Sequence, residues 1–229
     1  MATREERIKK IIEMAREDLK KHRYHTALAS LEEIYEADND NSEIHYYLGI
    51  ANARLGRYKR AAFFLEKVIN SDLSFLNRIH ARMILGYIHT ILENYEEALK
   101  HFSEVVKAGF ESAQAYSAIG YLKYKLGNTK DAIMTLYRAI ELDENNANAH
   151  NSLGYILAET EINLEEAYEE CKKALRLDRN NPAYLDSLGW VCYKMGKLTE
   201  AKELIRSAYE KAPDNDEIKY HYNVVFKKI

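Results

Sequence analysis

Apolar residues along this chain recur at the spacing of an α-helix. In the stretch AQAYSAIGYLKYKLGNTKDAIMTLYRAIELDENN, residues 113–146, Tyr116, Ile119, Gly120 and Lys123 are spaced i, i+3, i+4 and i+7, so they share one helical face. The start of the chain, MATREERIKKIIEMAR, mixes charged with apolar residues and predicts an amphipathic helix rather than a signal peptide. Because the 229 residues include two prolines and abundant Ala, Leu, Glu and Lys, the pattern predicts an all-helical protein.

Two residue types repeat with the same period. Glycines are separated by 37, 34, 34 and 35 residues, at Gly49, Gly86, Gly120, Gly154 and Gly189. Alanines are separated by 34, 37, 34, 35 and 34 residues, at Ala27, Ala61, Ala98, Ala132, Ala167 and Ala201. The glycine and alanine spacings both lengthen from 34 to 37 and from 34 to 35 at the same places in the chain. These longer spacings indicate a three-residue insertion around FLNR, after the second unit, and a one-residue insertion in the ETEIN turn. The chain is therefore an array of repeated units.

The unit resembles the tetratricopeptide repeat, whose pattern is W-x2-L-G-x2-Y, then A-x3-F, then P. In residues 113–146, Tyr116 takes the tryptophan position, Ile119 and Gly120 the Leu-Gly position, and Ala132 and Leu136 the A-x3-F positions. The resemblance implies one right-handed α-solenoid over residues 1–229, with repeats 8–41, 42–75, 79–112, 113–146, 147–181 and 182–215 and a capping helix 216–229. Two departures are that only Pro213 keeps the terminal proline and that Ala15 stands where glycine is usual.

Small residues at two positions of the unit predict close helix packing. Glycine at position eight and alanine at position twenty allow the two helices of a hairpin to approach. The motifs LGRYKRA, LGNTKDA and MGKLTEA predict the turn between them, because glycine ends one helix and a short polar stretch begins the next. In the last segment we expect four residues to face inward and the lysines and His221 to meet water; the four are Ile218, Tyr222, Val225 and Phe226.

Positions two, five, nine and twelve of the unit form a second stripe on the first helix. In the tetratricopeptide-repeat arrays that this chain resembles, residues at these positions line a concave groove, and extended peptides commonly bind in it. We expect a peptide-binding groove there with nine contributing residues: Tyr87, Tyr121, Tyr124, Asn148, Asn151, Tyr155, Asp186, Trp190 and Tyr193. The rings give large contact area with few rotors to immobilise, and the polar residues can satisfy a bound backbone. The alternative is that these rings pack on neighbouring helices.

Charge excludes several kinds of partner. The net charge is −3, from 33 basic and 36 acidic residues, which gives no electrostatic reason to expect nucleic acid or an anionic membrane. The resembled family includes a clamp of Lys, Asn and Arg for acidic chaperone tails. Here the corresponding positions hold residues such as Ser117, Tyr121, Ala183 and Ser187, so we do not expect such tails to bind.

Catalytic and metal motifs do not occur in the sequence, so we expect no catalytic residue, no metal and no cofactor. The eight histidines show no zinc-binding spacing. His22 and His25 are predicted in a solvated turn, whereas His45 and His150 take position four, a core position. Cys171 and Cys192 are expected to be buried free thiols on adjacent helices, with a pairing between them as the alternative.

The expected function is that of a non-catalytic adaptor that binds a protein segment in its groove. The alternative is a structural subunit of a larger assembly, in a cell envelope or a motility machine, or a solenoid that associates with itself. The final repeats look like those of bacterial members of the resembled family. The expected location is the cytoplasm, or the periplasm if a leader precedes the chain.

Overall fold

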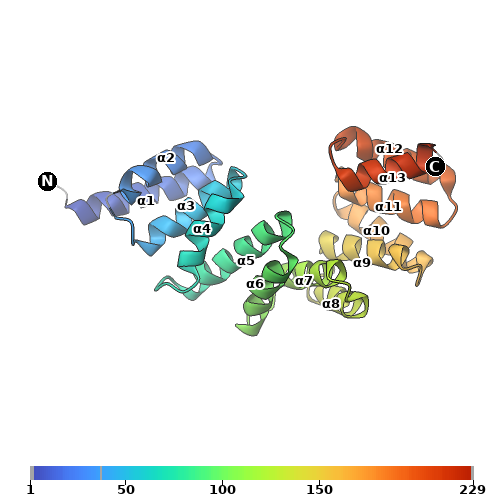
Figure 1. Cartoon of the computed structure of the whole chain (residues 1–229), viewed down its shortest axis with the longest axis horizontal. Helices are drawn as coiled ribbons and strands as arrows, with labels where there is room; N and C mark the ends of the chain where they lie inside the picture. The colour runs from blue at the N-terminus through green and yellow to red at the C-terminus, as the bar shows by residue number, and fades with distance from the viewer. Residues whose placement is uncertain (1–2, 37, 228–229) are drawn as a thin grey trace. The chain divides into compact units, whose positions relative to one another are not determined.

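The computed structural model describes residues 3–36 and 38–227, which form thirteen helices and divide into two compact units (Figure 1). Unit 1, Met1–Phe110, contains α1 (Arg4–Lys20), α2 (Tyr24–Tyr35), α3 (Ser42–Arg54), α4 (Tyr58–Val68), α5 (Phe75–Ile91) and α6 (Tyr95–Lys107). Unit 2, Glu111–Ile229, contains α7 (Ala113–Lys125), α8 (Thr129–Leu142), α9 (Ala147–Glu159), α10 (Leu164–Leu177), α11 (Pro182–Lys194), α12 (Leu198–Lys211) and α13 (Asp216–Lys227). The all-helical prediction is confirmed.

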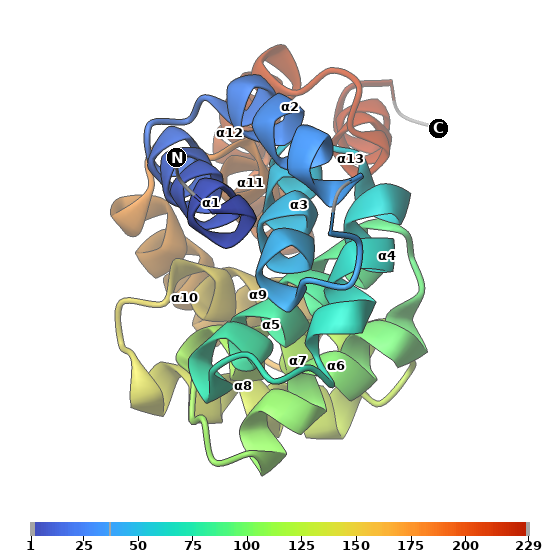
Figure 2. The ribbon, with the colours of Figure 1, turned by 90° about the vertical axis from the view of Figure 1, so that its left-hand side faces the viewer.

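Each predicted repeat contains one pair of helices that pack on each other, from α1 with α2 to α11 with α12. Within each unit the first helices of successive repeats are also in contact: α1 with α3, α3 with α5, α7 with α9 and α9 with α11. Figure 2 shows α3 beside the first hairpin, which is formed by α1 and α2. This is the stacked-hairpin arrangement of a solenoid. Among the described helices, none combines the length and apolar character needed to cross a bilayer.

The first helix of every repeat begins at a capping side chain. A Thr, Asn or Ser accepts a hydrogen bond from a backbone N–H of the first turn, at Thr3, Asn41, Ser74, Ser112, Asn146 and Asn181. The predicted insertion around FLNR lies in the first turn of α5, which has 17 residues where α7 has 13. The extra residues therefore lengthen a helix and do not form a loop.

The glycine at position eight lies directly against the side chain four residues after the repeat alanine. A Cβ added at Gly49 would lie 2.5 Å from Cγ of Leu65, and one added at Gly154 would lie 2.5 Å from Sγ of Cys171. The same close approach joins three further pairs: Gly86 with Phe102, Gly120 with Leu136, and Gly189 with Ile205. These partners are fully buried, so the predicted close packing of the two helices is confirmed.

The turn between the two helices of each repeat contains one residue with positive φ. In repeats two, four and six it is the predicted glycine, at Gly56, Gly127 and Gly196. In repeats one, three and five it is a residue with a side chain, at His22, Glu93 and Glu161. An L-residue is strained in this conformation because its Cβ approaches the following carbonyl oxygen. Half of the turns therefore hold a residue that is not the one best suited to the backbone.

Both cysteines are buried free thiols, as expected. Burial raises the pKa of the Cys192 thiol to about 12, so this thiol is protonated at neutral pH. His45 and His150 are buried and His22 and His25 are exposed, as expected, although His25 lies in α2 and not in the turn.

Replacing Gly49 with Ala should destabilise the fold by about 1–3 kcal/mol, because the new methyl group would overlap Leu65. Leu65→Ala should cost about 2–5 kcal/mol through the cavity that it leaves. In the double variant the smaller side chain at 65 makes room for the methyl group, so the loss should be less than the sum by roughly 0.5–3 kcal/mol. Urea unfolding measures all three, and strict additivity would contradict the packing described here.

Replacing Glu93 with Gly should stabilise the fold by roughly 0.5–1 kcal/mol, because glycine adopts the φ of 58° without strain. The matched variant is Gly127→Ala at the equivalent turn, where an added Cβ meets no atom within 4 Å, so only backbone strain is tested. Its melting temperature should fall while that of Glu93→Gly rises. Thermal unfolding followed by circular dichroism measures both melting temperatures. If both variants shift in the same direction, the turn residue is not under the backbone strain described here.

Candidate functional site

A cavity of about 220 Å³ lies in unit 2 among the first helices of repeats four, five and six. Helices α7, α9 and α11 line it, and the start of α13 closes one side. We call it the tyrosine cavity; its lining residues are Tyr121, Tyr124, Lys125, Asn151, Ser152, Tyr155, Ile156, Ala183, Asp186, Ser187, Asn215, Glu217 and Ile218. Three consecutive repeats thus contribute to one hollow.

Five of the nine residues predicted for the groove lie in this lining: Tyr121, Tyr124, Asn151, Tyr155 and Asp186. They come from positions five, nine and twelve of their repeats, which fall on one side of a helix that turns about 100° per residue. Since successive first helices pack side by side, equal positions on them come together. The three tyrosines are half-buried, so part of each ring remains accessible.

Two buried oxygens at the cavity have no hydrogen-bond partner in the described structure. They are Oδ1 of Asn151 on α9 and Oδ1 of Asp186 on α11. Leaving a buried acceptor unpaired costs about 1–3 kcal/mol, so such atoms mark positions where a donor belongs. Both residues line the tyrosine cavity.

Tyr155 connects the cavity to the closing helix. Its hydroxyl donates a hydrogen bond of 2.7 Å to Oε1 of Glu217 on α13, and its ring lies edge-on to that of Tyr124. Burial, followed by the neighbouring Glu217 carboxylate, raises the pKa of Tyr155, so its hydroxyl keeps its proton at neutral pH. Glu217 was not predicted for the site, although it occupies position two of the last, incomplete unit, which belongs to the groove stripe.

Trp190 lies beneath the closing helix and is only 6% exposed. Its ring stacks on His221 of α13 at 4.1 Å between centroids and also on Tyr193 at 5.2 Å. The indole N–H donates to Oε1 of Glu159 at 2.6 Å. Contacts within the protein therefore cover most of the Trp190 ring and pair its N–H. At this position the structure has the alternative in which the ring packs on a neighbouring helix.

His221 is a correction to the sequence prediction, which expected it to meet water. It is 2% exposed, and its Nδ1 lies 2.7 Å from Oδ2 of Asp186, which is 3% exposed. The stacked Trp190 covers the imidazole, so α13 buries its histidine and does not present it outward. Burial raises the pKa of Asp186, and the neighbouring His221 opposes that rise. The inward placement of Ile218 and Val225 is confirmed, since both are buried.

The remaining predicted residues lie elsewhere. Asn148 is exposed and accepts a hydrogen bond of 2.7 Å from the Tyr184 hydroxyl, and Tyr193 contacts Trp190 without lining the cavity. Tyr87 belongs to unit 1, where it is 44% exposed and packs edge-on against Phe102. A role of these residues in binding stays a prediction.

Comparison with known families identifies the repeat. The family described as "TPR repeat" matches residues 120–160, which include the glycine–side-chain contact and the turn of repeat four. The chain therefore contains tetratricopeptide (TPR) repeats. The family described as "Anaphase-promoting complex, cyclosome, subunit 3" also matches, over residues 20–105. Proteins with TPR repeats mediate protein–protein interactions.

Individual relatives support the same family. A "TPR repeat-containing protein PA4667" of Pseudomonas aeruginosa is 40% identical over 60 residues, which are 26% of this chain and 10% of that protein. The structure of YrrB, titled "a TPR protein with an unusual peptide-binding site", has a TM-score of 0.55 at 22% identity and covers 87% of this chain and 98% of its own. The structure of pilF from Pseudomonas aeruginosa has a TM-score of 0.72 at 15% identity, with coverage of 95% and 97%. The two structures show a shared fold.

Replacing His221 with Ala should destabilise unit 2 by about 3 kcal/mol, because the Asp186 carboxylate would remain buried without its partner. The emission of Trp190, which is the only tryptophan, should move to longer wavelength as water reaches the uncovered ring. Adding Asp186→Asn should recover part of the stability, since no buried charge is then left unpaired.

The exposed His25 provides the control, and His25→Ala should change neither the unfolding midpoint nor the emission. Urea titration followed by fluorescence gives both quantities in one experiment. Unchanged emission from a folded His221→Ala variant would mean that the imidazole does not shield the indole.

Proposed function

We propose that this TPR protein is an adaptor that binds an extended segment of a partner protein in the tyrosine cavity. The observation that carries the proposal is the pair of unpartnered acceptors, on Asn151 and Asp186, within a lining of half-buried tyrosines. An extended peptide presents backbone N–H groups at regular intervals, and these are the donors that such acceptors lack.

The size of the cavity supports a peptide anchor over a cofactor. Sites for drug-sized ligands have volumes of about 300–1,000 Å³, whereas the tyrosine cavity has about 220 Å³. A space of this size suits one or two side chains of a chain that continues along the surface. YrrB, a protein of this fold, has an unusual peptide-binding site, which is compatible with the same use here.

The charges at the cavity favour a partner that brings hydrogen-bond donors. Asp186 and Glu217 are acidic, and Asn151, Ser152 and Ser187 are neutral. The Lys125 ammonium lies 5.7 Å from the centre of the Tyr121 ring and is the basic member of the lining. We therefore infer that the bound segment carries a donor side chain, such as an amide, a lysine or an arginine, and not the acidic tail that other members of the family bind.

Tyrosine hydroxyls and rings would supply most of the contact area. Tyr121, Tyr124 and Tyr155 come from two adjacent first helices, and Tyr124 and Tyr155 already contact each other edge-on. Desolvated tyrosines at interfaces commonly contribute about 2 kcal/mol or more each. Their helices hold them in place before binding, which lowers the entropy lost on association.

Peptides selected from a random library against the whole chain test this function. Their affinities for the wild type and for Tyr121→Ala and Asn151→Ala are then measured by fluorescence anisotropy. We expect each substitution to weaken binding by about tenfold or more, because one removes a ring and the other an acceptor.

The matched control is Tyr137→Ala, which removes a tyrosine that is 39% exposed on α8, outside the cavity lining. It should leave the affinities unchanged. If the selected peptides bind all folded variants equally well, or if no peptide is enriched, the tyrosine cavity is not the binding site.

A further inference from the structure

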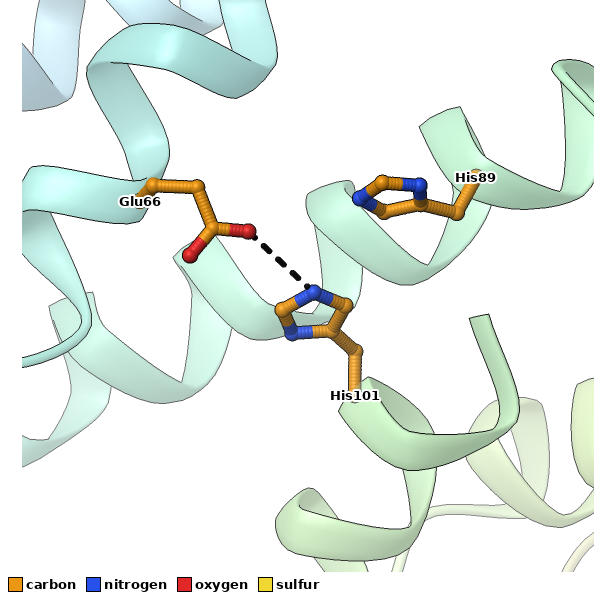
Figure 3. A group of neighbouring side chains, drawn as sticks. All are labelled: Glu66, His89 and His101. Atoms are coloured by element: carbon orange, nitrogen blue, oxygen red, sulfur yellow. Dashed lines mark ion pairs between the residues drawn. The ribbon is translucent and has the colours of Figure 1, made fainter. Parts of the chain in front are cut away.

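Three side chains that are far apart in the sequence converge inside unit 1. Glu66 comes from α4, His89 from α5 and His101 from α6, as Figure 3 shows. One ligand atom from each residue lies within 4.8 Å of the other two. The imidazoles stack with their ring centres 5.4 Å apart and their planes inclined by 13°. Two imidazoles and one carboxylate are a common ligand set for divalent transition metals.

Three imidazole nitrogens of this cluster have no hydrogen bond among the described residues. His101 is 3% exposed, and neither Nδ1 nor Nε2 of its ring has a hydrogen bond among the described residues. Its Nε2 lies 3.4 Å from Oε1 of Glu66, but this contact is not a hydrogen bond. Nδ1 of His89 is likewise buried and unpaired. Buried polar atoms are nearly always paired, so three such nitrogens in one place indicate a missing ligand.

We propose that Glu66, His89 and His101 bind one divalent transition-metal ion of the zinc class. Zinc bonds to histidine nitrogen at about 2.0–2.1 Å and to carboxylate oxygen at about 2.0–2.2 Å. Ligands at those lengths around a tetrahedral ion lie about 3.4 Å apart. Oε1 of Glu66 and Nε2 of His101 already have this separation. The third ligand, His89, is half-buried and stacked on His101, so its ring has to turn to aim a nitrogen at the ion.

The charges around the cluster act on a bound cation in both directions. Arg82 and Lys100 oppose a bound cation, whereas the carboxylates of Glu66 and Glu97 favour it.

The bound ion would join the second helix of repeat two to both helices of repeat three. The cluster supplies three protein ligands, so a water molecule would complete four-coordination. Because the ligands belong to two repeats, binding would oppose their separation and raise the stability of unit 1. The role of the ion is that of a structural connection between repeats.

The sequence expectation of no metal was based on linear motifs, and the cluster has none. His89 and His101 occupy positions eleven and twenty-three of repeat three. In repeat four the same positions hold Lys123 and Thr135, and Nζ of Lys123 donates to Oγ1 of Thr135 at 3.1 Å. The contact shows that these two positions meet across a hairpin. Histidine at both positions of one repeat therefore predicts two neighbouring imidazoles, once the sequence is aligned to the repeat.

Zinc titration of the whole chain tests the proposal. The protein is prepared without a histidine tag, stripped with a chelator and titrated with Zn²⁺ in a calorimeter. We expect one ion per chain with micromolar or tighter affinity. Saturating Zn²⁺ should also raise the melting temperature of the wild type by several degrees.

Variants locate the ion. His101→Asn and His89→Asn should abolish the one-to-one binding. Glu66→Gln, which alters an exposed side chain and so keeps the fold, should weaken it by at least about tenfold. The control His25→Ala removes an exposed histidine and should bind as the wild type does.

Two results would overturn the proposal. One is the absence of saturable one-to-one binding by the wild type. The other is binding, with its gain in melting temperature, that survives in Glu66→Gln and in both histidine variants. Because peptide affinity for unit 2 is measured separately, neither result bears on the proposed adaptor function.

Discussion

The fold depends on the absence of one side chain in five of its six hairpins. At Gly49, Gly86, Gly120, Gly154 and Gly189 the opposite helix approaches so closely that even a methyl group would overlap its core residue. The two helices are thereby held at a fixed distance, and the residues on either side of the glycine are fixed in direction. Position nine, immediately after the glycine, must then turn away from the hairpin partner, toward the first helices of neighbouring repeats. The tyrosine cavity is a consequence of that constraint in repeats four and five, whose position-nine residues Tyr121 and Tyr155 line it.

Helix α13 changes which aromatic surfaces of the last repeats remain accessible. In an open array Trp190 would present its face as Tyr121 and Tyr155 do, but His221 stacks on it and Asp186 pairs with that imidazole. The same helix contributes Glu217, which holds the Tyr155 hydroxyl at the edge of the cavity. The closing helix therefore both removes one aromatic surface and completes the wall of another. Its role extends beyond covering the apolar end of the array.

Most of the fold could be predicted from the sequence, because each repeat is specified locally by a small set of residues. Gly120, Ala132 and Leu136 already define which helices pair and which faces meet, and five of the nine predicted groove residues share one cavity. His221 was missed because its burial depends on how α13 is rotated over α11, which no repeat pattern specifies. The cluster of Glu66, His89 and His101 was missed because its two histidines form no linear motif and Glu66 comes from another repeat. Contacts that recur within each repeat can be predicted from the repeat pattern, whereas contacts between repeats of different sequence are seen only in the three-dimensional structure.

The alternation of turn residues has a consequence for protein engineering. Gly56, Gly127 and Gly196 adopt the left-handed turn without strain, whereas His22, Glu93 and Glu161 adopt it as L-residues with side chains. The turns of repeats two, four and six are thus free of backbone strain, whereas the turns of repeats one, three and five are strained. Longer synthetic arrays built from this protein are best assembled from repeats two, four and six.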